Sequence, residues 1–200
     1  MWLSAALGYA IGSLPLGYLA ARRWAGVDLR RVGSGNVGAT NVLRVSGPSL
    51  GLLVMLADVA KGVAAVLLAG RVAPSEVGTV SAGVAAVAGH MFPIWLRGRG
   101  GKGVATACGV FAVLSPVATV CAAGTFLLTV WSTRLVSAGS VVASAALPLA
   151  ATALGASPAV SAGSLLTGVL VVWRHRRNLQ RVWRGTERRL GHSGGEEPRA

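Results

Sequence analysis

Long apolar stretches without charged residues dominate this sequence. Four of them contain no Asp, Glu, Lys or Arg, and a fifth, residues 49–70, is interrupted only by Asp58 and Lys61. Each is at least about 18 residues long, which lets an apolar α-helix cross a ~30 Å hydrocarbon core. We therefore predict an all-α, polytopic membrane protein, in which Asp58 and Lys61, spaced i, i+3, form a structural ion pair. The four uncharged stretches are residues 2–21, 77–96, 103–133 and 135–173.

Charge is scarce and unevenly placed along the chain. Only 12% of the residues are charged, whereas a soluble domain carries about 25%. The net charge of +13 is concentrated in short basic clusters that adjoin the apolar stretches. A nucleic-acid-binding domain would carry such residues on a soluble face with aromatic stacking partners. We therefore exclude nucleic acid as a partner and expect the lipid bilayer instead, with the clusters acting as topology signals.

The two longest stretches decide the number of helices. Residues 103–133 would form a straight helix of about 46 Å, which is too long for one span. Pro116 breaks this stretch because proline lacks an amide donor and clashes with the preceding turn. Residues 135–173 divide in the same way at residues 155–158. We therefore predict a bundle of about seven transmembrane helices, some of them short or broken.

Basic residues then predict the orientation, because cytoplasmic loops are rich in Lys and Arg. With seven helices and an outer N-terminus, every Lys and Arg except Lys61 and Arg71 falls on the cytoplasmic side or in the cytoplasmic tail. Six helices would leave the basic C-terminal segment outside. Basic residues follow the first stretch instead of preceding it, so we interpret it as a retained helix and not as a cleaved signal peptide. We predict one domain over residues 1–191 and a polar tail over residues 192–200.

A segment rich in Gly and Asn, residues 33–44, follows the first apolar stretch. It contains a G-x-G-x-x-G pattern, and Asp58 lies beyond it at the spacing of a dinucleotide fingerprint. That fingerprint requires a βαβ unit, whereas Asp58 lies in an apolar helix, so we reject it. Glycines still let backbone amides approach an anion; the alternative is a polar loop at the membrane surface. The candidate site residues in this segment are Ser34, Gly35, Asn36, Asn41 and Arg44.

A second polar segment, residues 89–106, joins two apolar stretches. It is not an ATP-binding P-loop, because Leu96 and Gly103 occupy the positions that this motif requires for Gly and Ser or Thr. Its basic residues and glycines favour a flexible nest for a phosphorylated substrate. A topology signal would explain the charges but not the glycines. The candidates here are Arg97, Arg99, Gly101, Lys102 and His90, the last being either a site residue or a hydrogen-bonded packing residue.

The third polar segment, residues 174–191, follows the last apolar stretch. If the helix continues beyond that stretch, His175 and Asn178 are spaced i, i+3 and share a face. From there both side chains can reach a polar pocket next to Arg174. The alternative is a basic tail that binds anionic lipid headgroups.

These three segments resemble the motifs of one family. Their residue types and order in 34–44, 89–106 and 174–187 are similar to those of the bacterial acyl-phosphate-dependent glycerol-3-phosphate acyltransferases. The likeness extends from the first apolar stretch to about residue 191. Arg99 and Arg189 stand where the family pattern has Lys, which keeps the charge but changes the hydrogen-bond geometry.

The resemblance implies a membrane enzyme that transfers a fatty acyl group from acyl phosphate to the 1-hydroxyl of glycerol 3-phosphate. The products are lysophosphatidic acid and phosphate, and the reaction is the first step of phospholipid synthesis. The resemblance also implies seven helices in the bacterial inner membrane, a site that faces the cytoplasm, and neither a metal ion nor another cofactor. Because both substrates carry phosphate, Arg44 and Lys102 are the first candidates for binding, followed by Arg97, Arg99 and Arg174.

Three further side chains suit this chemistry. Acyl phosphate is already activated, so an acyl-enzyme is not required. Ser34, His175 and Asn178 are the candidate catalytic residues, which would position hydroxyl groups or polarise the acyl carbonyl. His175 is the best candidate for a general base, and a substrate phosphate is the alternative.

A transporter or flippase of a phosphorylated small molecule is the main alternative to an enzyme. Seven helices, a broken helix and a basic pocket are compatible with that function. Transporters usually place the binding site near the midplane of the membrane and contain internal repeats. Here the glycine clusters lie at helix ends and the sequence shows no repeat, so we favour the enzyme.

Overall fold

The computed structural model describes residues 1–72 and 74–191, and within these ranges it is helical with no strand. The elements are α1 (Trp2–Ser13), α2 (Leu16–Trp24), α3 (Ala39–Ser46), α4 (Pro48–Val72), α5 (Glu76–Met91), the 3₁₀ helix η1 (Ile94–Leu96), α6 (Val104–Leu114), α7 (Pro116–Thr133), α8 (Val136–Ala153), α9 (Pro158–Arg174) and α10 (Arg176–Trp183). The predicted all-α class is confirmed. The predicted tail, residues 192–200, lies outside the described residues.

Seven apolar helical segments correspond to the predicted spans in the part of the chain that the structure describes. Two are short, α6 and α9; α6 has 11 residues, or about 16 Å, and therefore cannot cross a hydrocarbon core alone. The predicted polytopic bundle with short and broken helices is confirmed. The five segments long and apolar enough to cross a membrane are Trp2–Trp24, Pro48–Val72, Glu76–Leu96, Pro116–Thr133 and Val136–Ala153.

Prolines and local caps explain where the long stretches divide. α7 begins at Pro116, as predicted, because proline fits the first turn of a helix but disfavours continuation of the helix before it. The predicted division at 155–158 is also present: Gly155 has a φ of 76°, and the Ser157 hydroxyl accepts the N–H of Val160 at 3.2 Å to cap α9. The break at Pro15 between α1 and α2 differs from the prediction, which treated residues 2–21 as one helix.

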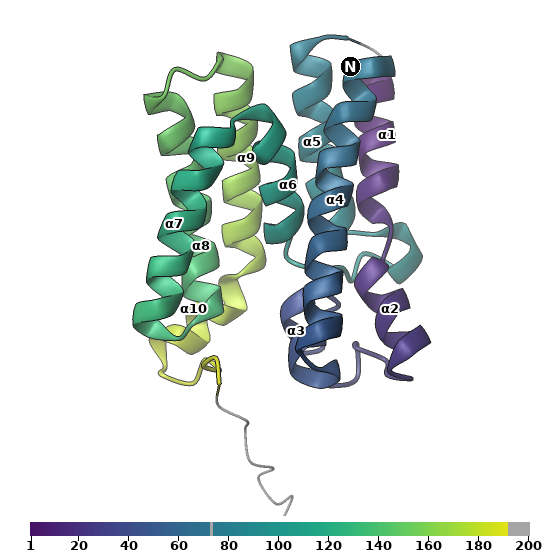
Figure 1. Ribbon diagram of the computed structural model, residues 1–200, viewed down its shortest axis with the longest axis vertical. Coiled ribbons are helices and arrows are strands. Elements are labelled where there is room, and N and C mark those ends of the chain that lie inside the picture. Colours follow the sequence, from purple (N-terminus) through teal and green to yellow (C-terminus); the bar gives the residue numbers. More distant parts are fainter. Residues whose placement is uncertain (73, 192–200) are drawn as a thin grey trace, which may run out of the picture.

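Helices α1 and α5 lie side by side (Figure 1), and small residues let them approach closely. Gly8 and Gly12 of α1 lie on the backbone of α5, so that a Cβ at either glycine would overlap Ala82 or Ala86. Gly109 of α6 lies in the same way on the backbone of α4. Such interfaces are typical of membrane bundles, where close van der Waals packing drives helix association.

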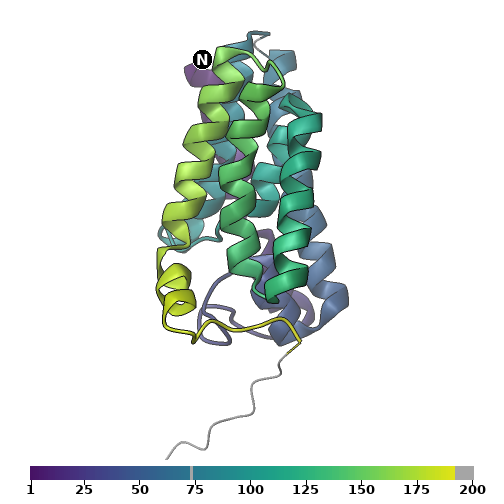
Figure 2. The ribbon, with the colours of Figure 1, turned by 90° about the vertical axis from the view of Figure 1, so that its left-hand side faces the viewer.

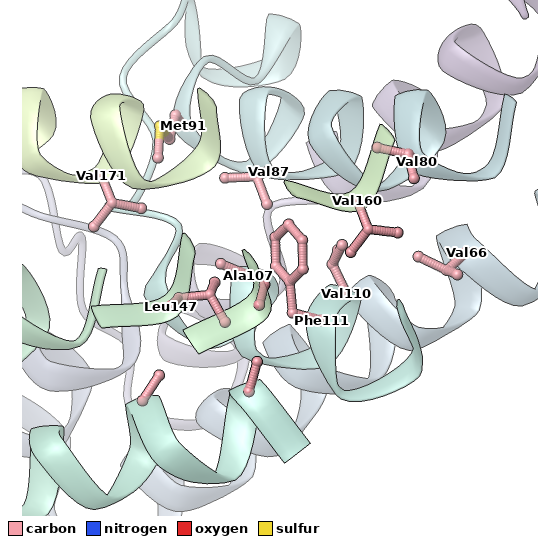
Figure 3. Close-up of a cluster of buried hydrophobic side chains, with 13 residues drawn as sticks. Val66, Val80, Val87, Met91, Ala107, Val110, Phe111, Leu147, Val160 and Val171 are labelled. Atoms are coloured by element: carbon pink, nitrogen blue, oxygen red, sulfur yellow. The ribbon is translucent and has the colours of Figure 1, made fainter. Parts of the chain in front are cut away.

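An apolar core joins α6 to its neighbours (Figure 3). Phe111 of α6 is fully buried and lies beside Val110 and Val160. Large apolar side chains on the outer faces are exposed instead, for example Trp131 at 79% and Leu149 at 72%. Exposed apolar surface of this kind suits contact with lipid chains.

The polar segments gather at one end of the bundle. The N-terminus lies at the end opposite to α2, α3 and α10 (Figure 1, Figure 2). Arg174, at the end of α9, also contacts the segment between η1 and α6. Three segments that are far apart in the sequence are thereby brought to the same end of the molecule.

Candidate active site

The segment before α3 is folded around one buried side chain. Asn41 is 2% exposed, and its Oδ1 accepts the backbone N–H of Ser34 at 2.8 Å. Its Nδ2 donates to the carbonyls of Leu29 and Val32 at 3.4 and 3.2 Å. Because buried backbone groups are costly to leave unpaired, Asn41 fixes the loop that carries the exposed Ser34.

Asn36 and Gly35 shape the turn that leads into α3. The Asn36 Oδ1 accepts the N–H of Gly38 at 2.8 Å, a local turn for which asparagine is well suited. Gly35 has a φ of 71°, in the region that favours glycine. Arg44 follows in the last turn of α3 and interacts electrostatically with Glu187 of the C-terminal segment.

Left-handed backbone conformations turn the chain back between η1 and α6. Arg97, Gly98 and Gly103 have φ angles of 51°, 74° and 84°. The turn places Gly101 against His90, because the Gly101 N–H donates to the His90 carbonyl at 3.0 Å. A Cβ at position 101 would overlap the imidazole ring, so the glycine is required by close approach.

Arg174 connects this loop to the end of α9. Its Nη2 donates to the carbonyls of Gly100 and Gly101 at 2.9 and 3.0 Å, and its Nε donates to the Gly101 carbonyl at 3.2 Å. The guanidinium also lies over the Phe92 ring, 5.3 Å from its centroid. The rigid fork of donors that only arginine offers suits such paired acceptors. These contacts fix the loop that carries Lys102.

His175 is 2% exposed and follows Arg174 at the end of α9. Its Nδ1 lies 2.8 Å from the carbonyl oxygen of Val171. Because a carbonyl only accepts, Nδ1 carries the proton and the neutral ring presents Nε2 as an acceptor. Burial, followed by the positive charge of Lys102, lowers the pKa of His175 to about 4. The ring is therefore neutral at pH 7.

Glu187 joins the C-terminal segment to α10. Its Oε1 accepts from Asn178 Nδ2 at 2.5 Å, and its Oε2 accepts from Arg181 Nε at 2.6 Å. Although burial acts in the opposite direction, these hydrogen bonds hold the pKa of Glu187 below its ordinary value. The N–H of Leu190 donates to the carbonyl of Arg134 at 2.7 Å, so the segment reaches the connection between α7 and α8.

Lys102 lies among several other cations. Burial lowers the pKa of Lys102 to about 8; Glu187 acts in the opposite direction, while Arg181, Arg44 and Arg174 lower it further. Among these groups, the positive charges of Lys102 and three arginines are balanced by one carboxylate, that of Glu187. A bound anion would relieve this repulsion, and phosphate oxygens are suited to accept charge-assisted hydrogen bonds from Arg and Lys.

The structure brings five of the candidate residues together at this end of the bundle. They come from α3, from the loop before α6, and from the end of α9 with the adjoining α10. The five are Arg44, Lys102, Arg174, His175 and Asn178. Electrostatic interactions join the first four of these residues, and Asn178 is linked to them through its hydrogen bond to Glu187.

Four other candidates, His90, Asn41, Arg97 and Arg99, are placed differently. His90 is turned toward α4, where its Nδ1 lies 2.7 Å from Lys61 Nζ, and Asn41 uses its polar atoms on the backbone. Arg97 and Arg99 are exposed. Their guanidinium groups make no hydrogen bond within the ranges 1–72 and 74–191.

Sequence reasoning gave no role to Arg181 or Glu187. Arg181 stands three residues after Asn178 and therefore on the same helical face, which is the signal that points to it. Glu187 is the acidic residue of a strongly basic segment, and its role as a shared acceptor follows only from the fold of the C-terminal segment.

Comparison with known proteins agrees with this arrangement. A family model described as glycerol-3-phosphate acyltransferase matches residues 2–185. A glycerol-3-phosphate acyltransferase of Synechococcus sp. (strain CC9902) is 48% identical over 190 residues, which cover 94% of each chain. That of Syntrophotalea carbinolica is 44% identical and covers 91% of this chain and 93% of its own.

Two solved structures have the same fold. A crystal structure of PlsY (YgiH), an integral membrane glycerol 3-phosphate acyltransferase in its glycerol 3-phosphate form, superposes with a TM-score of 0.90 at 37% identity and covers 95% of both chains. Its lysophosphatidic acid form gives a TM-score of 0.88 at 35% identity, with the same coverage. On these matches, the chain belongs to the family of membrane-integral glycerol-3-phosphate acyltransferases.

Proposed function

We propose that this protein transfers a fatty acyl group from acyl phosphate to the 1-hydroxyl of glycerol 3-phosphate, releasing lysophosphatidic acid and inorganic phosphate. The observation that carries the proposal is the cluster of Arg44, Lys102 and Arg174 beside the neutral His175 at one end of an apolar bundle. Two phosphorylated reactants and a membrane-bound product suit a basic site at the edge of a bilayer. The glycerol 3-phosphate and lysophosphatidic acid forms of the related PlsY support the same acceptor and product.

Arg44 and Lys102 are the residues that we assign to direct phosphate binding. Neither side chain makes a hydrogen bond to another group in the described part of the chain, so their donors are available. The Arg174 guanidinium donates most of its hydrogen bonds to the carbonyls of Gly100 and Gly101. We therefore assign it mainly to shaping the loop and to the positive field of the site. The amides of Gly98, Gly100 and Gly101 already donate to backbone carbonyls, so the phosphate donors that we assign are side chains.

Because acyl phosphate is already activated, the reaction needs correct orientation of the two reactants and does not require an acyl-enzyme intermediate. The 1-hydroxyl oxygen attacks the acyl carbonyl carbon, the bond from that carbon to the phosphate oxygen breaks, and phosphate leaves with the bonding electrons. We assign Ser34 and Asn178 to positioning hydroxyl groups or polarising the carbonyl. His175 offers its Nε2 as an acceptor for the attacking hydroxyl.

The proton of the attacking hydroxyl needs an acceptor. A pKa of about 4 makes His175 a weak base at pH 7, since general bases work best with a pKa near the operating pH. A phosphate monoester has its second pKa near 6, so a substrate phosphate is the better final acceptor. We therefore assign His175 to orienting the attacking hydroxyl group. We assign a substrate phosphate to accepting the proton of that hydroxyl group.

An apolar groove next to this site suits the acyl chain. It lies between α8 and α9, has a volume of about 720 Å³, and extends from Trp173 toward Pro148 and Thr152. Trp173, at one end of the groove, and Arg174 both lie against the Phe92 ring, so this end of the groove is close to the basic cluster. We propose that the chain of acyl phosphate lies along this groove while its phosphate contacts the cations.

We further propose that the protein resides in the bacterial inner membrane, with its N-terminus outside and the site and C-terminus in the cytoplasm. The end of the bundle that carries the candidate site also carries α2, α3 and α10 (Figure 1), with most of the described basic residues. Basic residues favour the cytoplasmic side. Glycerol 3-phosphate, a charged solute, would then reach the site directly from the cytoplasm.

Incubation of the purified protein with acyl phosphate and labelled glycerol 3-phosphate tests the proposal. We expect labelled lysophosphatidic acid and an equal amount of phosphate. A transporter or flippase of a phosphorylated small molecule, the second candidate, would give no acylated product. Absence of product from folded protein would therefore refute the enzymatic function.

A further inference from the structure

A buried cluster of charged and polar groups lies behind the loop of the candidate site. Asp58 and Lys61 of α4 are 3% and 5% exposed and form an ion pair of 2.8 Å. His90, near the end of α5, completes the cluster, with its Nδ1 2.7 Å from Lys61 Nζ and 3.4 Å from Asp58 Oδ1. Charges inside a membrane protein are costly and persist where they are paired or functional. The reaction proposed above uses none of these three side chains.

Lys61 connects three helices through its ammonium group. An ammonium has three donors and no acceptor. Here it donates to His90 Nδ1 at 2.7 Å and to the carbonyl of Leu14 at 3.3 Å, and it forms an ion pair with Asp58 Oδ1. The Leu14 carbonyl lies at the break between α1 and α2, where helix ends leave acceptors without partners. Because the ammonium donates to Nδ1, a neutral His90 carries its proton on Nε2, and the orientation of its ring is fixed.

The other edge of the same ring lies against the loop. His90 contacts Gly101 twice, through the backbone hydrogen bond of 3.0 Å and through the imidazole, whose Nε2 occupies the space where a Cβ of residue 101 would lie. The carbonyl of Gly101 in turn accepts from Arg174, and Lys102 is the next residue. A continuous chain of contacts therefore runs from the buried ion pair to the cations of the site.

We propose that Asp58, Lys61 and His90 are positioning residues for acyl transfer. The ion pair holds the His90 ring against Gly101, and the ring holds the loop in the conformation from which Lys102 meets a phosphate. This inference rests on the proposed function and adds a role that lies one layer behind the site. Of the two alternatives for His90, it favours the hydrogen-bonded packing residue, because the side chain is directed to α4 and to the back of the loop.

The double variant Asp58→Leu/Lys61→Met tests this role. It removes both buried charges at similar volume, a change that leaves stability nearly intact when neither charge remains unpaired. Loss of one charge-assisted contact in the chain corresponds to about a tenfold effect. We therefore expect kcat/KM to fall about tenfold through KM, with kcat within about twofold of the wild type. Amide hydrogen exchange of residues 97–103 should quicken by about the same factor.

Ser4→Ala is the matched control. Ser4 is a fully buried polar residue near the N-terminal end of α1, whereas Lys61 contacts the carbonyl of Leu14 just after the C-terminal end of this helix. We expect wild-type KM and exchange for this variant. Wild-type KM and exchange in the double variant, or a loss confined to kcat, would overturn the positioning role. Lysophosphatidic acid formation by the wild type checks the proposed function separately. If the wild type is inactive, the exchange of residues 97–103 still decides whether the cluster holds the loop.

A second variant keeps the inference testable if the double variant does not fold. His90→Asn retains an oxygen that can accept from Lys61, but it removes the ring edge that contacts Gly101. The proposal predicts the same faster exchange of residues 97–103 with the ion pair still in place. Unchanged exchange in this variant would show that the ring does not hold the loop and would refute the inference.

Discussion

The pKa of Lys102 gives the candidate site a pH dependence that can be measured. Lys102 is the cation to which we assign phosphate binding, and burial lowers its pKa to about 8. A lysine with a lowered pKa is charged below that value and loses its charge as the pH rises through it. Binding of a phosphorylated substrate should therefore weaken as the pH increases from 7 to 9. Glycerol 3-phosphate keeps its charge in this range, because its second pKa is near 6.

The size of the effect follows from the charged fraction of Lys102. With a pKa of about 8, roughly 90% of the free enzyme carries the charge at pH 7 and roughly 10% at pH 9. An apparent dissociation constant is divided by the fraction of the competent form, so the apparent affinity should fall about tenfold over these two pH units. In Lys102→Arg the side chain stays charged throughout, and the decline should disappear.

Steady-state measurement of the KM for each substrate between pH 6.5 and 9.5 is the assay. We expect the KM for the substrate whose phosphate contacts Lys102 to rise with a midpoint near pH 8. Glu187→Gln is the matched variant, because the negative charge of Glu187 raises the pKa of Lys102. Its loss should move the midpoint to lower pH. Wild-type KM values that stay constant from pH 7 to 9 for both substrates would refute the assignment of Lys102.

Substitutions at Asn41, His175 and Val169 have three further expected outcomes. Asn41→Ala removes three hydrogen bonds of a buried amide, so it should destabilise the protein by about 3 kcal/mol in detergent unfolding, whereas Ser34→Ala at the exposed position should stay within about 0.5 kcal/mol. His175→Ala should lower kcat by about 10- to 100-fold without changing the shape of the pH–rate profile between pH 3.5 and 7.5; loss of an acid limb near pH 4, at the pKa of His175, would instead identify His175 as the base. Val169→Trp, in the groove between α8 and α9, should raise the KM for long-chain acyl phosphates but not for short-chain ones, and an equal effect on both would remove the groove as the acyl site.

The sequence was sufficient for the helical bundle because the physical causes are local. An uncharged stretch of sufficient length becomes a membrane helix, and Pro116 begins a new helix within a stretch that is too long for one span. The break at Pro15 was missed for an equally local reason. The stretch around it has the length of a single span, so length gave no reason to divide it.

The side-chain partners of the site were harder to predict. Gly, Asn and Arg in residues 33–44 indicate a polar anion site, but the composition does not show that Asn41 is directed inward to the backbone of its own loop. The sequence also left open whether His90 is a site residue or a packing residue. The contact of its Nδ1 with Lys61 of the neighbouring helix α4 favours packing. The link between Arg181 and Glu187 depends on how the C-terminal segment turns back, and no periodic pattern encodes that turn.

The central claim is that three remote polar segments form one site at the cytoplasmic end of the bundle. Cysteine labelling with a membrane-impermeant maleimide, in sealed vesicles of both orientations and with the native cysteines replaced, tests it most directly. Arg31, Arg99 and Arg177 are exposed positions in these segments or beside them, and Ser75 and Leu154 are exposed at the opposite end. We expect cysteines at the first three positions to react only from the cytoplasmic side and cysteines at the other two only from outside. Labelling of any of the first three from the outer side would contradict the account.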